Sequence, residues 1–229
     1  MKVHAIQRSI EQYLAFLNSG ESEKWTHLFG IIDRFHHTWD PGAEQIAGSF
    51  SQSLQNEVSR RLWRRESFDA RAMMLKFMEM EPEYVRQMFR DLYDESKAID
   101  ARIDRFRFYC DELLQLARQR DQTGKILAHD QDASMISFYL AGRFPEKYAI
   151  YPGLKVFQQA LMQFESPKPV QYDDLERFFK VCKALHTIGL KESRLADALG
   201  TRFATHPGRA GYMQWTGELM LSLAQNPLF

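Results

Sequence analysis

Residues 60–65, Arg-Arg-Leu-Trp-Arg-Arg, combine the side chains best suited to contact with nucleic acid. A guanidinium group binds phosphate through a planar pair of hydrogen bonds, and an indole can stack on a base or a sugar. If the segment is helical, residues four apart share a face, so the arginines form a compact patch. We therefore predict a nucleic-acid-binding site made of Arg60, Arg61, Trp63, Arg64 and Arg65. The alternative is a solvated turn whose arginines pair with Glu57, Glu66 and Asp69.

A second run of aromatic and basic residues spans positions 138–152, FYLAGRFPEKYAIYP. Its members could line a surface for a base or a peptide, and they supply three second-tier candidates for nucleic-acid contact: Arg143, Lys147 and Tyr148. The pattern favours the alternative, in which the aromatic side chains anchor a proline-bounded connection into the core.

The sequence offers few groups for catalysis or metal binding. Gly124-Lys125 lacks the rest of the GxxxxGK[ST] pattern, so no P-loop is predicted. The histidines at 36–37 and the run 129–132 lack the spacing typical of zinc sites. Cys110 and Cys182 fall among apolar residues at helical spacing, which indicates core positions. We predict no catalytic residue, metal or cofactor, although an active site of dispersed carboxylates would leave no such trace.

The composition is that of a folded globular protein. The chain has 229 residues, of which 30 are basic and 30 acidic, and 45% are hydrophobic. Zero net charge argues against a globally basic nucleic-acid coat protein but is compatible with a local basic patch. Two cysteines exclude a disulfide framework and indicate the cytoplasm. Because no stretch approaches the roughly 20 apolar residues of a membrane span, no membrane contact is predicted.

Apolar residues recur at helical spacing along nearly the whole chain, so we predict an all-α multi-helix bundle. A heptad pattern from Val85 to Ala117 predicts one long central helix over about 83–118, and shorter helices follow it. Asp69 and Asp132 are expected to cap helices, and Pro82 to begin one. The polar residues 118–130 suggest a boundary between an N-terminal bundle, 1–120, and a C-terminal subdomain, 129–229, or a loop within one continuous domain.

Two stretches of the sequence, 70–106 and 129–152, resemble the N-terminal helical region of McrB-like restriction ATPases/GTPases. The resemblance covers roughly residues 25–225, and its motifs are Trp39-Asp40, Met74–Phe77, Glu81–Phe89 and Asp132–Tyr148. It implies a region that precedes an AAA+ motor in a modification-dependent restriction or anti-phage system, where the N-terminal part selects the target, commonly DNA. No Walker motif lies within the 229 residues, so the motor is expected in a longer chain or in a separate partner.

These observations lead to one hypothesis and one rival. The hypothesis is a non-enzymatic recognition domain that binds DNA, such as a modified duplex, or a phage-derived trigger, and works with an AAA+ motor in cis or in trans and a partner nuclease. The rival is a protein-interaction or assembly module without nucleic-acid contact. The heptad pattern, which also fits a homo-oligomer, and the methionine-rich segment 73–80 favour the rival.

Overall fold

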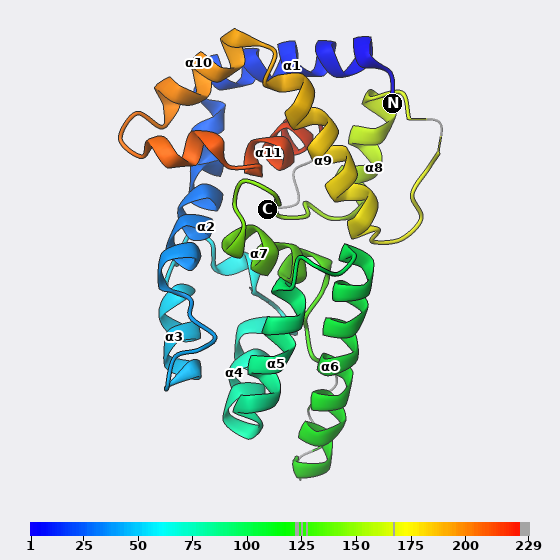
Figure 1. Ribbon diagram of the computed structural model, residues 1–229. Helices are drawn as coiled ribbons and strands as arrows, with labels where there is room; N and C mark the ends of the chain where they lie inside the picture. The colour runs from blue at the N-terminus through cyan, green and yellow to red at the C-terminus, as the bar shows by residue number, and fades with distance from the viewer. Residues whose placement is uncertain (122–123, 125, 127, 167, 225–229) are drawn as a thin grey trace.

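The computed structural model describes residues 1–121, 124, 126, 128–166 and 168–224. It is all-α, as predicted, apart from one very short hairpin (Figure 1). Eleven α-helices occur in the described residues: α1 (Val3–Asn18), α2 (Thr26–Thr38), α3 (Ile46–Ser53), α4 (Ala70–Met80), α5 (Pro82–Tyr93), α6 (Ile99–Arg120), α7 (Ala133–Arg143), α8 (Leu154–Gln163), α9 (Leu175–Gly189), α10 (Ser193–Arg202) and α11 (Gln214–Leu223).

Short-range capping signals place several of these helix ends where the sequence predicts them. The Asp69 carboxylate accepts a hydrogen bond from the Ala72 backbone N–H at 2.9 Å and begins α4. Asp132 does the same for α7 through the Met135 backbone N–H, also at 2.9 Å. Pro82 occupies the first turn of α5, where its missing N–H leaves no helical hydrogen bond unmade.

The prediction of a single long helix over 83–118 is wrong. The chain forms two helices there, α5 and α6, and turns back between them. Figure 1 shows the two helices packed side by side, and residues 94–98 connect them. The Asp94 carboxylate accepts hydrogen bonds from the Ser96 backbone N–H at 3.1 Å and from its hydroxyl at 2.6 Å, which fixes a tight turn. The apolar pattern is continuous across the turn because both helices bury their apolar faces in one core, as at Phe89 and Phe106.

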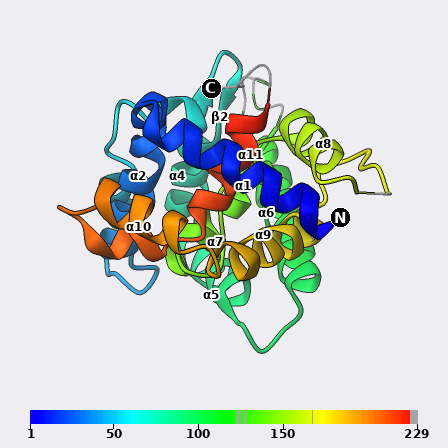
Figure 2. The same ribbon diagram turned by 90° about the horizontal axis from the view of Figure 1, so that it is seen from above.

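The helices group in space differently from their order in the sequence. In Figure 1, α1 lies with α8, α9, α10 and α11 at one end of the molecule, and α3 to α6 form the other end. Figure 2 looks down on α1 and shows it crossing α11, against which it packs. Helix α7 packs on both α2 and α5, and the buried apolar residues form one cluster that includes both ends of the molecule. Among the described residues, no helix is long and apolar enough to cross a membrane.

A buried ion pair ties the helices of the α1 end together. The Glu218 carboxylate on α11 is fully buried and accepts two hydrogen bonds from the Arg202 guanidinium, at 2.6 and 2.9 Å. It also accepts one from the Tyr13 hydroxyl of α1 at 2.5 Å. Because the charges are paired and hydrogen-bonded, their burial is tolerated, and we assign this cluster to the fold.

Candidate phosphate-binding surface

The arginine-rich segment 60–65 is not α-helical, so its arginines do not form the patch that a helix would give. Its first residues form a single 3₁₀ turn, η2 (Arg60–Leu62). The last two form strand β1 (Arg64–Arg65), which pairs antiparallel with β2 (Phe68–Asp69). The preceding Ser59 is buried, and its hydroxyl donates a hydrogen bond to the His27 carbonyl oxygen at 3.3 Å. The segment is therefore held against the start of α2.

The two arginines of the hairpin are engaged by acidic side chains. Arg64 lies 3.4 Å from the Asp69 carboxylate, one of the pairs that the solvated-turn alternative predicts. Arg65 lies 3.2 Å from the Asp132 carboxylate, and its guanidinium covers the Phe68 ring at 4.5 Å from the centroid. Both side chains are solvent-exposed, but their charges are already balanced locally. They are therefore weaker phosphate ligands than the sequence implies.

The prediction that Trp63 stacks on a base or sugar is wrong. Only 3% of Trp63 is exposed, because the residue packs into the hydrophobic core beneath the turn. Its backbone carbonyl accepts a hydrogen bond from the Ala70 N–H at 2.9 Å, which places it at the base of the hairpin. The Trp63 side chain is therefore part of the core and cannot contact a ligand in solvent.

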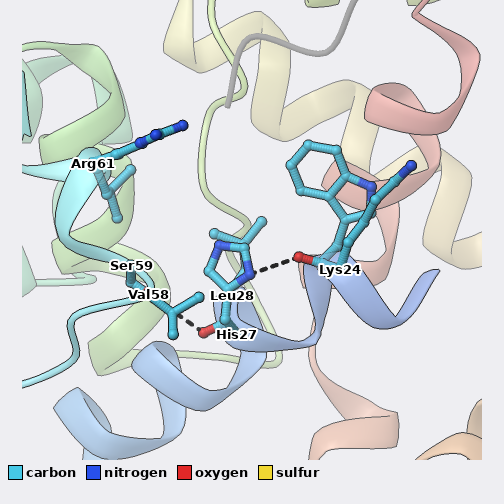
Figure 3. Close-up of a pocket in the computed structure, with 8 residues that line it drawn as sticks. Lys24, His27, Leu28, Val58, Ser59 and Arg61 are labelled. Atoms are coloured by element: carbon cyan, nitrogen blue, oxygen red, sulfur yellow. Dashed lines mark hydrogen bonds between the residues drawn. The ribbon is translucent and has the colours of Figure 1, made fainter. Parts of the chain in front are cut away.

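The first two arginines of the segment are exposed. Within the described part of the chain, the side chains of Arg60 and Arg61 have no hydrogen-bond or ion-pair partner. Arg61 borders a hollow of about 260 Å³, whose lining also includes Lys24 and His27 (Figure 3). The apolar part of the lining comprises Trp25, Leu28, Val58 and Leu62. The hollow thus joins a basic rim to an apolar floor.

Two segments that are distant in sequence form this hollow. Lys24 belongs to the 3₁₀ helix η1 (Glu21–Trp25), and His27 lies in the first turn of α2. Figure 3 shows the His27 imidazole between Lys24 on one side and Arg61 on the other. Lys24 and His27 are not among the residues that the sequence predicts for the site. Their spacing of three residues indicates a shared helical face, but nothing local links that face to Arg61.

Hydrogen bonding fixes the state of the histidine. Its Nδ1 lies 2.8 Å from the Lys24 carbonyl oxygen, and because a carbonyl only accepts, Nδ1 carries the proton. Burial lowers the pKa of His27, so the ring is neutral at pH 7 and its Nε2 is an acceptor. An anion beside Nε2 would favour the protonated ring, in which both nitrogens donate.

Lys24 is not fully committed to its partner. Its ammonium lies 2.6 Å from the Glu21 carboxylate, but the two side chains are 53% and 63% exposed. Exposed pairs of this kind contribute about 0–1 kcal/mol, so a phosphate can compete for the lysine. The partners of Arg64 and Arg65 differ from Glu21 because Asp69 and Asp132 are only 36% and 38% exposed and are held in place as helix caps. Arg34, seven residues after His27 on the same face of α2, donates to the Gln52 carbonyl at 2.9 Å and is also exposed. We call the set Lys24, His27, Arg34, Arg60 and Arg61 the basic surface.

The second-tier residues lie elsewhere. Arg143 is at the C-terminal end of α7, whereas Arg65 pairs with Asp132 at the N-terminal end, about 16 Å away for 11 residues at 1.5 Å each. The Arg143 guanidinium lies 5.9 Å from the centroid of the Tyr93 ring. The two groups of predicted residues therefore do not form one continuous patch.

Lys147 and Tyr148 are partly occupied by contacts within the protein. Lys147 lies 2.6 Å from the Glu95 carboxylate, and the Tyr148 hydroxyl accepts a hydrogen bond from Arg102 at 2.5 Å. Both residues line a groove of about 560 Å³ whose apolar members include Ile99, Phe179 and Met213. Acidic and basic side chains both border this groove: Glu95, Glu146, Glu176, Lys147, Lys180 and Lys183.

The two cysteines are buried, as predicted, and burial raises the pKa of both thiols. A buried thiol that stays protonated is a poor nucleophile. Among the residues that the structure describes, no group of three or more histidine, cysteine, aspartate or glutamate side chains is arranged to hold a metal ion. His36, one of the two adjacent histidines, instead contacts the Gly142 carbonyl oxygen through Nδ1 at 3.0 Å.

Comparison with known proteins gives no relative: no family model matches the chain, and no curated protein or solved structure is significantly similar to it.

Proposed function

We propose that this protein is a non-enzymatic recognition domain that binds nucleic acid through phosphate contacts at the basic surface. The observation that carries the proposal is the pair of exposed, unpartnered arginines in the described structure, Arg60 and Arg61, beside a hollow that Lys24 and His27 also line. Each guanidinium offers a phosphate two parallel N–H donors without first breaking an internal ion pair.

The biological setting is part of the same proposal and rests on the resemblance of 70–106 and 129–152 to McrB-like proteins. In that setting the domain selects DNA, such as a modified duplex, or a phage-derived trigger, and an AAA+ motor in cis or in trans acts with a partner nuclease. Two unpaired thiols, Cys110 and Cys182, support a cytoplasmic location.

Fluorescence anisotropy with short labelled duplexes and single strands tests the binding. The informative variant is Arg60→Glu/Arg61→Glu, which reverses the two unpartnered charges. The matched control is Lys155→Glu/Lys191→Glu, which reverses two exposed lysines of α8 and of the turn before α10. Both variants change the net charge by the same amount, so a difference between them reports position and not overall charge.

We expect the arginine variant to lose at least tenfold in affinity and the lysine control to lose less than twofold. Equal losses would show that net charge, and not this surface, governs binding. Undetectable binding of the unaltered protein at micromolar concentration and low salt would contradict the proposal itself. Comparing unmodified with cytosine-modified duplexes shows whether the domain also reads the modification.

The 560 Å³ groove favours a second candidate function, a protein-interaction module. Its apolar floor, with Phe179 and Met213, and its rim of both charges resemble the core and rim of a protein interface. Sedimentation at several protein concentrations tests one form of this function. Concentration-dependent dimers would support homo-oligomeric assembly, and a monomer at all concentrations would contradict it.

A further inference from the structure

Arg61, Lys24 and His27 line one hollow in the basic surface, and the size of this hollow limits which kind of phosphate can bind there. The hollow of about 260 Å³ is lined on one side by η1 and the start of α2, and on the other by residues 58–62. Its volume falls below the roughly 300–1,000 Å³ of a pocket for a drug-sized ligand. It is large enough for a phosphate with part of one nucleoside.

We propose that this hollow holds the terminal phosphomonoester of a nucleic-acid strand, with the attached sugar against its apolar floor. This inference rests on the proposed function. An internal phosphodiester has a nucleoside on both sides, whereas a volume of about 260 Å³ has room for part of only one. A strand end presents only one nucleoside and enters from one direction. The floor residues Leu28, Val58 and Leu62 supply apolar contact for that nucleoside, and 70% of Val58 is exposed.

The charge of the hollow matches a monoester better than a diester. A phosphomonoester carries about −1.5 to −2 charges at pH 7 because its second pKa is near 6, whereas a backbone diester carries one. In the described structure Arg61 offers a full, unpartnered positive charge, and His27, which lines the same hollow, adds a second when a bound phosphate protonates its ring. The Lys24 charge is offset by Glu21 and adds a third only when that exposed pair opens. A terminal phosphate also has three unesterified oxygens, which can accept hydrogen bonds from the Arg61 guanidinium and from the protonated Nε2 of His27.

The test compares three 12-nucleotide single strands of identical sequence: one with a 5′-phosphate, one with a 3′-phosphate and one with hydroxyl groups at both ends. Anisotropy competition against a labelled hydroxyl-ended strand measures all three with the full chain. The informative variant is Arg61→Gln. Because the side chain is exposed, we expect the variant to fold, and circular dichroism checks this. His27→Gln is the second variant, and Lys155→Gln on α8 is the control.

We expect at least one phosphorylated strand to compete five- to tenfold more strongly than the hydroxyl-ended strand, and the 5′ and 3′ strands show which end is held. The advantage should fall below twofold in Arg61→Gln and persist in Lys155→Gln. Equal, salt-sensitive binding of all three strands would overturn the inference. A preference for phosphorylated strands that persists in Arg61→Gln would also overturn it. Both results would leave the proposed function unaffected. No binding of any strand would overturn both.

Discussion

Removing the two unpartnered arginines should change how steeply nucleic-acid binding depends on salt. Each phosphate contact releases counterions, so log Kobs falls against log salt with a slope of about −0.9 per contact on duplex DNA. If Lys24, Arg34, Arg60 and Arg61 each contact one phosphate, the slope is about −3.6, and Arg60→Ala/Arg61→Ala reduces it to about −1.8. Between 50 and 200 mM salt, affinity then falls about 150-fold for the unaltered protein and about 12-fold for the variant.

Anisotropy titrations of one duplex at four or more salt concentrations give these slopes directly. The control is Arg64→Ala/Arg65→Ala, which removes the same number of arginines from the adjoining hairpin. Because these two already face Asp69 and Asp132, we expect the slope to change by less than about 0.5. A control that flattens the slope as much as Arg60→Ala/Arg61→Ala would refute the reasoning that unpartnered arginines make the contacts.

Three further predictions follow from side chains near the surface and in the core. Burial lowers the pKa of His27, so the free ring is neutral at pH 8 and gains its proton more readily as the pH falls. Because a phosphate favours the charged ring, affinity for a hydroxyl-ended strand should rise several-fold from pH 8 to pH 6. His27→Gln should remove this rise. Trp63→Ala should lower the free energy of unfolding in urea by about 3–5 kcal/mol, while the folded variant keeps the salt slope of the unaltered protein. Arg202→Met leaves the buried Glu218 carboxylate without its ion-pair partner and should lower the free energy of unfolding by about 3–5 kcal/mol. Adding Glu218→Gln removes the buried charge and should restore part of the lost stability. A double variant no more stable than Arg202→Met alone would contradict this.

Features that depend on a few neighbouring residues were predictable from the sequence. The caps at Asp69 and Asp132 and the helix start at Pro82 involve contacts within three residues, so the local sequence contains the whole signal. The all-α class follows from helical spacing of apolar residues, which the buried core confirms. In contrast, Glu218 and Tyr13 are 205 positions apart, and no local pattern indicates that they meet.

The break between α5 and α6 shows how a periodic pattern can mislead. Apolar residues on both sides of the turn face the same core, so the heptad spacing continues in register across residues 94–98. The available signal was Ser96, a polar residue at a heptad core position, two residues after an aspartate that can accept its N–H. That local hydrogen bond competes with continuation of the helix.

The candidate site was predictable only in part. The sequence predicts a basic segment at residues 60–65, and Arg60 and Arg61 of that segment are exposed in the structure. Residue type alone could not show that Trp63 is buried, because its burial depends on a hairpin and a core formed by distant helices. Nor could it bring Lys24 and His27 to Arg61, since contact between these segments arises only in the folded chain, through Ser59 and the His27 carbonyl.

The central claim is that nucleic acid binds at the basic surface, and mapping the bound strand on the protein tests it most directly. Backbone amide chemical shifts of the ¹⁵N-labelled protein, recorded while a 12-nucleotide strand is added, locate the contact without any substitution. We expect the largest shifts at residues 24–28 and 57–62, with little change around Lys147 and α9. Shifts concentrated at the groove of Lys147, Tyr148 and Phe179, or no shifts at all, would contradict the claim.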